Sequence, residues 1–193
     1  MKPKLTINFV TSNKNKVKEI KQILEPEIQV NPVLIAYPEM RSDNPEEIAR
    51  QSAEMLANKL RKNVVVEDSG LFIKALNDFP GTCSAYIHKK IGLNGIIKLM
   101  DGIKDRDCTY KSAVAYCEPK KKPISFLGEE KGKIAEGVRG DFGFGHDPIF
   151  IPERSGKTYG ETKAYAKLKK FRRRAVLKLR DCLLNKLNQK FKY

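Results

Sequence analysis

The stretch Val64-Val65-Val66-Glu67-Asp68-Ser69-Gly70 joins three β-branched residues to two carboxylates, a hydroxyl and a glycine. The valines predict a strand that is buried on both faces, as in a parallel or mixed sheet. Ligands of open α/β proteins bind beyond the carboxyl ends of such strands, where we expect Glu67 and Asp68 to lie. Adjacent buried acids need a positive partner, and a divalent metal with phosphate oxygens would supply one. Asp-Ser-Gly is also typical of a solvated turn, so both interpretations stay open.

The size and composition of the chain predict one soluble domain. Its 193 residues are enough to bury a core without disulfides or metal ions, and we expect a single domain over residues 1–193. No apolar run is long enough for a signal peptide core or a membrane span, so we expect a cytoplasmic protein without membrane contact. The four cysteines form no C-x-x-C pair, which argues against a zinc site (Cys83, Cys108, Cys117 and Cys182).

The positive charge is concentrated near the C-terminus. The net charge is +15, and residues 163–193 hold 12 Lys or Arg against the single acid Asp181. Such a block is compatible with nucleic acid, an anionic surface or a polyphosphate ligand, and charge alone does not separate them.

The N-terminal part predicts a strand, a polar loop and an amphipathic helix. A strand over residues 5–10 precedes the loop Thr11-Ser12-Asn13-Lys14-Asn15-Lys16, and apolar residues at helical spacing follow. Ser12 or Asn13 is the expected N-cap. Lys14 and Lys16 then stand at the positive end of the helix dipole, where cations are disfavoured. An anion bound at this helix start would explain them.

The remaining segments predict further strands and helices. Residues 28–36 read as a second strand, and Asn44-Pro45 starts a helix, which leaves Glu39 at a strand end as a candidate ligand. Residues 108–117 read as a strand, and residues 124–127 with 132–138 could pair with it through a turn. Phe142 and Phe144 lie in the glycine-rich segment 140–148, which can approach a flat ligand. The chain ends in one long helix with an apolar stripe from Leu168 to Leu187.

Five motifs in register give a resemblance to a known family. They are Thr11-Ser12-Asn13-x-x-Lys16 with Glu19, Pro38-Glu39, Glu67-Asp68-Ser69-Gly70-Leu71, Pro80-Gly81-x-x-Ser84 and Gly143-Phe144-Gly145-His146-Asp147-Pro148-Ile149-Phe150. Together these motifs resemble the inosine triphosphate pyrophosphatases, also called XTP/dITP diphosphatases. The resemblance implies an α/β fold with a long, mixed, curved sheet flanked by helices, and two lobes with a central nucleotide cleft. It also implies a homodimer and Mg²⁺-dependent hydrolysis of ITP, dITP and XTP to the monophosphate and pyrophosphate.

The resemblance also assigns roles to residues. Residues 11–16, from Thr11 to Lys16, would hold the triphosphate, and Asp68 would activate the attacking water. Glu39 and Asp68 would bind the metal, with Glu67 as a further candidate ligand. Ser69 would touch the substrate, and the base would be read by residues 144–147, by Lys167 and by an arginine of the last helix, as follows: Phe144, Gly145, His146, Asp147, Lys167, and Arg172 or Arg173.

The last helix departs from the family pattern, which normally includes Ser-His-Arg. The segment here reads Lys169-Lys170-Phe171-Arg172-Arg173-Arg174-Ala175. Alignment on Ala175 places Arg172 at the family arginine, whereas alignment on Glu161 and Lys167 places Arg173 there. His146 stands where a tyrosine is common, and we interpret it as a packing or stacking substitute.

Two alternative functions remain at this stage. The departure in the last helix allows a pyrophosphatase for other modified nucleotides, such as modified pyrimidine or methylated ones, on the same fold. The basic C-terminal helix allows a nucleic-acid-binding module. Its basic residues surround the helix and aromatics for base stacking are sparse there, so nucleic acid is the less favoured partner.

Overall fold

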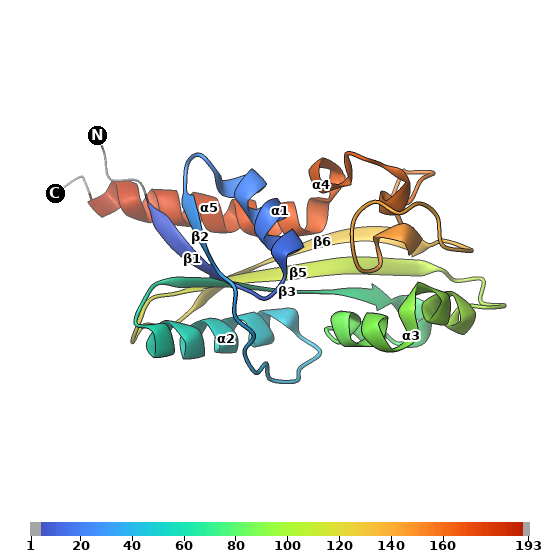
Figure 1. Ribbon diagram of the computed structural model, residues 1–193, viewed down its shortest axis with the longest axis horizontal. Helices are drawn as coiled ribbons and strands as arrows, with labels where there is room; N and C mark the ends of the chain where they lie inside the picture. The colour runs from blue at the N-terminus through green and yellow to red at the C-terminus, as the bar shows by residue number, and fades with distance from the viewer. Residues whose placement is uncertain (1–4, 191–193) are drawn as a thin grey trace. The chain divides into compact units, whose positions relative to one another are not determined.

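The computed structural model describes residues 5–190 as a mixed α/β protein (Figure 1). Its strands form a seven-stranded sheet in the order β2-β1-β3-β5-β6-β7, with β4 beside β3. β1 is parallel to β2 and β3, whereas β4 and β7 are antiparallel to their neighbours, so the predicted mixed sheet is confirmed. The elements are β1 (Thr6–Val10), α1 (Lys14–Leu24), β2 (Gln29–Val33), α2 (Pro45–Leu60), β3 (Val64–Ile73), η1 (Lys74–Leu76), β4 (Pro80–Gly81), α3 (Ser84–Leu99), β5 (Asp107–Cys117), β6 (Ile124–Ile134), η2 (Asp147–Ile149), β7 (Phe150–Pro152), η3 (Tyr159–Glu161), α4 (Tyr165–Leu168) and α5 (Lys170–Lys190).

The chain divides into two compact units that share three strands. Unit 1 takes the chain up to Asp68, residues 113–128 and the chain from Arg173 onward, and unit 2 takes residues 69–112 and 129–172. β3, β5 and β6 each pass from one unit into the other. The predictions of a single domain over residues 1–193 and of a cleft between lobes stay predictions. Within the described residues, no helix has both the length and the apolar character needed to cross a membrane.

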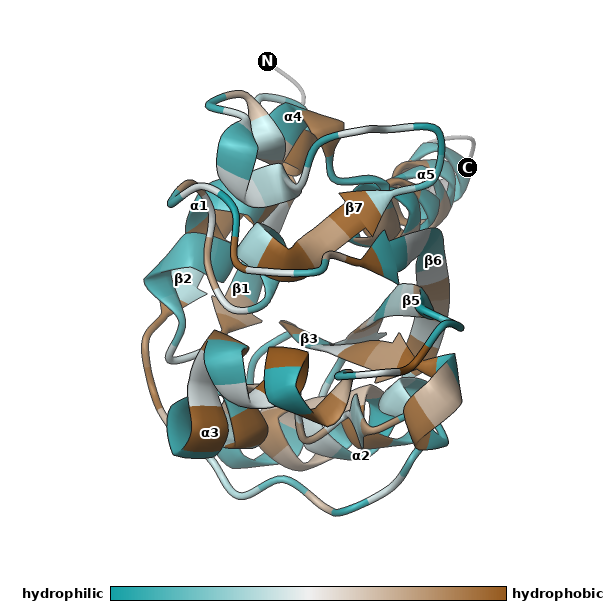
Figure 2. Cartoon of the chain, turned by 90° about the vertical axis from the view of Figure 1, so that its right-hand side faces the viewer, coloured by the Kyte–Doolittle hydropathy of each residue, from teal (hydrophilic) through white to brown (hydrophobic). Residues whose placement is uncertain are grey.

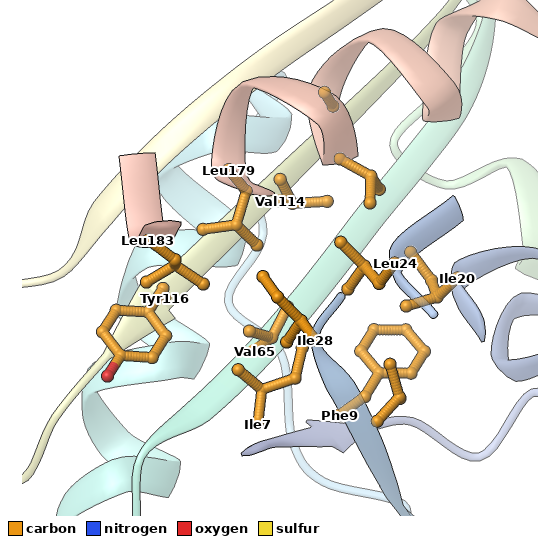
Figure 3. Packing of buried hydrophobic residues seen from close by; sticks show 13 residues of the cluster. Ile7, Phe9, Ile20, Leu24, Ile28, Val65, Val114, Tyr116, Leu179 and Leu183 are labelled. Carbon is orange, nitrogen blue, oxygen red and sulfur yellow. The ribbon is translucent and has the colours of Figure 1, made fainter. Parts of the chain in front are cut away.

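The sheet of unit 1 is buried on both faces, as the run of valines predicts. Val65 packs in a cluster with α1 and α5, whereas Val64 and Val66 pack in a second cluster with α2. The alternation follows because successive side chains of a strand point to opposite faces. α5 and α2 accordingly cover opposite faces of this part of the sheet (Figure 1). Figure 3 shows the first cluster, where Leu179 and Leu183 of α5 lie over β5 and β3. Burying each such side chain stabilises the fold by about 1.5–3 kcal/mol.

Helix caps fix where α1 and α2 begin. The Asn13 side chain accepts hydrogen bonds from the backbone N–H groups of Asn15 and Lys16, at 2.9 and 3.3 Å. The Asn44 side chain accepts one from Glu46 N–H at 2.9 Å, with Pro45 at the first helical position. Each cap satisfies N–H groups that have no partner within the helix. Both predicted helix starts are therefore confirmed, and Asn13 is the N-cap of α1.

Unit 2 has its own core cluster, which contains several stacked aromatic rings. The Tyr110 ring of β5 stacks on Phe171 with 4.5 Å between ring centres, and lies 4.6 Å from Phe150. Phe150 belongs to β7, which is mostly hydrophobic (Figure 2). Tyr159 stacks on the same Phe150 ring at 5.6 Å. This ring cluster holds the start of α5 against β5 and β7.

The structure corrects the predicted end of the central strand. β3 continues through Asp68 to Ile73, so Glu67 and Asp68 lie in the middle of a strand instead of at its carboxyl end or in a turn. Leu71 pairs with Gly81 of β4, and a Cβ atom on Gly70 would collide with the carbonyl of Gly81. The glycine thus permits close packing of backbone within a sheet, which a single sequence does not distinguish from a turn glycine.

Three further predicted boundaries are wrong. β6 runs without a break from Ile124 to Ile134, where the prediction placed strand at residues 124–127 and 132–138. The second strand ends at Val33, where the prediction placed its end at residue 36. The long C-terminal helix is interrupted at Lys169, which separates α4 from α5. As a result Leu168, which we assigned to the apolar stripe, is 48% exposed, whereas Phe171 is buried.

Candidate active site

The loop before α1 is held in place by its own side chains. Thr11 is buried, and its hydroxyl accepts a hydrogen bond from Asn13 N–H at 3.1 Å. Asn13 in turn caps α1, whereas Ser12 and Lys14 are exposed to solvent. The helix start therefore presents a fixed backbone and an exposed cation, which is the arrangement that binds phosphate at helix N-termini.

Lys16 links this helix to the acids of β3. Its Nζ atom lies 2.8 Å from Glu67 Oε2 and donates a hydrogen bond to the Glu67 carbonyl oxygen at 3.1 Å. The side chains of Glu67 and Asp68 are both buried. All these residues belong to unit 1, so this unit places a buried acid pair directly beside the lysine that follows the polar loop.

Tyr37 connects Glu39 to the same acids. Burial, the charge of Glu39 and a hydrogen bond to the Glu39 carboxylate raise the pKa of the Tyr37 phenol well above its usual value, and the charges of Asp68 and Glu67 add to the rise. Glu39 itself is exposed on the segment after β2. Because one phenol responds to all three carboxylates, Glu39, Glu67 and Asp68 share one electrostatic neighbourhood in unit 1.

The chemistry of this acid group fits a magnesium ion. Mg²⁺ prefers hard oxygen ligands and is usually held by one or two carboxylates together with substrate phosphates. Glu39, Glu67 and Asp68 supply such oxygens. Among residues 5–190, no three His, Cys, Asp or Glu side chains by themselves form a metal-binding group. Magnesium sites in nucleotide enzymes commonly use phosphate oxygens of the substrate as further ligands.

A second group of candidate residues lies in unit 2, around the ring of Phe144. The backbone N–H of Phe144 donates to Asp147 Oδ2 at 2.7 Å, and the same oxygen lies 2.7 Å from Lys169 Nζ. Lys169 Nζ also lies 4.1 Å from the centre of the Phe144 ring, within cation–π range. Gly143 permits this turn because its φ is +85° and a Cβ there would overlap Asp147. Gly145 continues the turn with φ +63°.

The last helix contributes one arginine to the same group. The Arg172 guanidinium is 5.6 Å from the centre of the Phe144 ring, and its Nη2 donates to Ser69 Oγ at 3.1 Å. Arg172 is 2% exposed, whereas Arg173 points to solvent. The structure thus brings Ser69, Phe144 and Arg172 together, as the alignment on Ala175 implies.

Lys167 and Lys169 differ from the arrangement that the resemblance implies. Lys167 is exposed, and no contact places it beside Phe144 in the described part of the chain. Lys169 is 2% exposed and occupies that place. The break between α4 and α5 turns Lys169 inward, and the sequence carries no signal that distinguishes this lysine from its neighbours.

His146 is buried beside a second histidine. Its ring centre lies 5.2 Å from that of His88 on α3, at an interplanar angle of 73°. Burial and the neighbouring His88 lower the pKa of His146 to about 4, so the ring is neutral at pH 7. A buried neutral ring supports the interpretation of His146 as a packing residue of the loop of residues 144–147.

The two groups differ in the chemistry that they offer. The group in unit 1 offers a helix start, Lys16 and carboxylates, which suit phosphates and a metal ion. The group in unit 2 offers an aromatic ring with two cations that donate hydrogen bonds, which suit a flat base bearing carbonyl oxygens. Tyr37 and Lys169 are the members that sequence reasoning missed.

Comparison with known proteins gives a consistent result. The Ham1 family matches residues 7–182 of the chain. A protein named dITP/XTP pyrophosphatase from Methanopyrus kandleri is 48% identical over 166 residues, which cover 86% of this chain and 88% of the relative. Its namesake from Methanosarcina acetivorans is 46% identical over 172 residues, covering 88% and 92%. Among solved structures, the Ham1 protein of Staphylococcus aureus matches with a TM-score of 0.79 at 28% identity, covering 93% of this chain and 99% of that one.

Proposed function

Because the chain belongs to the Ham1 family, we propose that it hydrolyses dITP, ITP and XTP to the nucleoside monophosphate and pyrophosphate. This activity removes non-standard purine nucleotides from the nucleotide pool. The observation that best supports the proposal is the buried acid pair of Glu67 and Asp68 on β3. Lys16, which follows the polar loop before α1, forms an ion pair with Glu67. Such a set of charges is what hydrolysis of a phosphoanhydride requires.

The residues of unit 1 take the triphosphate. Backbone N–H groups at the start of α1 and the Lys16 ammonium offset the negative charge of the phosphates. Asp68 accepts a proton from the attacking water as its oxygen adds to the anhydride, and the bond between the α- and β-phosphates breaks. The monophosphate and pyrophosphate separate. The water oxygen remains on the product whose phosphorus it attacked, and the other product leaves with the bridging oxygen.

Magnesium is the ion that we propose for this reaction, with Glu39, Glu67 and Asp68 as the carboxylates that would hold it. When bound, Mg²⁺ stabilises the charge that develops on phosphate oxygens. Tyr37 donates a hydrogen bond to Glu39 and stays protonated because its pKa is raised, so it can hold that carboxylate in one orientation. A homodimer stays a prediction that rests on the family resemblance, and a cytoplasmic location stays a prediction from the sequence.

The residues of unit 2 take the base. Phe144 supplies a ring for stacking, and Lys169 and Arg172 supply hydrogen-bond donors beside it. Hypoxanthine and xanthine carry a carbonyl oxygen where adenine carries an amino group. Donors fixed in this place would face the amino hydrogens of adenine and stay unpaired, which costs binding energy for ATP and dATP.

Analysis of the reaction products by phosphorus NMR tests the proposed function. We would incubate the purified protein with Mg²⁺ and, separately, dITP, XTP, dGTP, dATP and a modified pyrimidine triphosphate. We expect monophosphate and pyrophosphate from dITP and XTP, with dATP nearly untouched. Release of orthophosphate, or faster turnover of the pyrimidine substrate, would contradict the proposal. A parallel reaction in EDTA tests the requirement for metal, and undiminished activity there would argue against magnesium.

A further inference from the structure

The start of helix α5 is capped by a carboxylate from strand β6. Glu130 of β6 is 4% exposed, and its Oε2 accepts hydrogen bonds from the backbone N–H groups of Lys170 at 2.7 Å and Phe171 at 3.3 Å. The first N–H groups of a helix have no partner within the helix, and Ser, Thr, Asp or Asn just before it usually binds them. Lys169 stands there instead, and a lysine side chain accepts no hydrogen bond.

The capped residues, Lys170 and Phe171, lie in sequence between Lys169 and Arg172, the two cations near the Phe144 ring. Lys169 directly precedes Lys170, and Arg172 directly follows Phe171. Lys169 and Arg172 approach the Phe144 ring, and Arg172 also donates to Ser69. The cations therefore sit on backbone whose position depends on the hydrogen bonds to Glu130. A displacement of this helix start by about 1 Å is enough to spoil the alignment of a bound substrate.

Groups near Glu130 reinforce its hydrogen bonds to the start of α5. The Phe171 ring stacks on Tyr110, and the Tyr159 hydroxyl donates to the Leu168 carbonyl at 3.3 Å. Burial and the negative charge of Glu130 raise the pKa of Tyr159, so the phenol beside the carboxylate stays protonated. Hydrogen bonds from backbone N–H groups to a carboxylate in such a buried place are about twice as strong as neutral ones.

We propose that Glu130 is a positioning residue for base selection, which acts through the start of α5 on Lys169 and Arg172. This inference rests on the proposed function, because it explains how the two cations are held for a base with a carbonyl oxygen. In the described part of unit 2, no contact joins Glu130 to Phe144 or Ser69. It follows that loss of Glu130 changes the choice of base more than it changes the chemistry at the phosphates.

The test compares three variants with the wild type. Glu130→Val removes the acceptor, Glu130→Gln keeps an acceptor oxygen without the charge, and Leu183→Ala weakens α5 at a position remote in sequence from its start. For each protein we would measure thermal unfolding, and kcat and KM for dITP and dATP on the folded protein. We expect Glu130→Val to raise the KM for dITP about tenfold and to lower the dITP/dATP ratio of kcat/KM at least fivefold, with kcat for dITP within about threefold of wild type.

The other two variants separate positioning from stability. Glu130→Gln should give an intermediate increase in KM, about threefold, because its hydrogen bonds lack the charge. Leu183→Ala should unfold at a lower temperature and keep the wild-type dITP/dATP ratio within about twofold. A normal ratio and KM in Glu130→Val, or in Glu130→Gln if the valine variant does not fold, would overturn the proposal. A wild-type protein that does not hydrolyse dITP would instead overturn the proposed function.

Discussion

The two units build their candidate site residues in opposite ways. In unit 1 these residues come mainly from one loop and one strand, since residues 11–16 and 67–68 are each contiguous. In unit 2 they come from β3, the loop of residues 144–147, the break before α5 and the first turn of α5. Contiguous groups keep their geometry wherever a strand and a helix form. Scattered groups depend on tertiary packing, so the base side is where small changes in sequence can alter specificity.

The charges of the two units show the same contrast. In unit 1, Lys16 pairs with the acid of a buried strand and is 18% exposed in its side chain. In unit 2, both Lys169 and Asp147 are almost fully buried, and the pair sits against an aromatic ring. An ion pair of the second kind is sensitive to the removal of either partner, because the remaining charge stays buried.

The largest effect is expected from the acid assigned to the chemistry. Asp68→Asn should lower kcat for dITP by about 10²- to 10⁴-fold, because the amide cannot accept the proton of the attacking water. The fold should persist, as judged by circular dichroism, since the substitution keeps the shape of the side chain. Asp107→Asn, at an exposed position of β5, serves as the control. Wild-type turnover in Asp68→Asn would rule out the assigned role.

A second effect concerns the ion pair of unit 1. Lys16→Met should lower the free energy of unfolding by about 3 kcal/mol, because the Glu67 carboxylate loses the ammonium beside it. The double variant Lys16→Met/Glu67→Gln should recover most of this loss, since the Glu67 charge that lost its partner is then removed as well. Urea unfolding of both variants provides the measurement. Equal losses in the single and the double variant would mean that the pair contributes little to stability.

The pH dependence of stability tests the burial of His146. Its pKa in the folded protein is about 4, below the value of about 6.5 expected in the unfolded chain. The unfolded chain therefore takes up a proton first as the pH falls, and this group's contribution is complete above pH 6.5 and is lost between 6.5 and 4. From pH 6.5 to pH 5 the loss amounts to about 2 kcal/mol.

Urea unfolding at these two pH values, in wild type and His146→Phe, measures that loss. The variant should lose about 2 kcal/mol less than wild type over this range, because phenylalanine does not titrate. An equal pH dependence in both proteins would show that His146 is not the group responsible. The exposed residues of the base-side loop do not enter the comparison, since both proteins share them.

The smallest predicted effect distinguishes two neighbouring lysines. Lys169→Met should lower the dITP/dATP ratio of kcat/KM about tenfold, because one donor to the base is lost. Lys167→Met should leave the ratio within about twofold, since Lys167 is exposed. Steady-state kinetics on the two substrates gives both numbers. The reverse order of effects would favour the alignment on Lys167 and place Arg173 in the site.

Much of unit 1 could be predicted from the sequence because its signals are local. The three valines, the Asn13 cap and the Asn44-Pro45 helix start each act over a few residues, and the structure confirms them. The predicted end of β3 was wrong because Gly70 packs against Gly81, a partner eleven residues away. The same residues, Ser69 and Gly70, are typical both of a turn and of close packing between strands.

Less of unit 2 could be predicted because its geometry depends on where a helix breaks. The apolar stripe favoured one continuous helix, and it gave no sign that Lys169 would end α4 and turn inward. The sequence also left the choice between Arg172 and Arg173 open, and the structure buries Arg172 and exposes Arg173. One signal for Glu130 was present in the sequence. Strand alternation places it on the same face as Gly128 and Gly132, the buried face of β6, where a charged residue is unusual.

We propose that residues of unit 1 perform the hydrolysis and residues of unit 2 select the base. The most direct test is the dITP/dATP ratio of kcat/KM, measured side by side in wild type, Asp68→Asn and Lys169→Met. We expect Asp68→Asn to slow both substrates by the same factor and to keep the wild-type ratio within about twofold, whereas Lys169→Met lowers the ratio about tenfold. A changed ratio in Asp68→Asn, or an unchanged ratio in Lys169→Met, would contradict this division of roles.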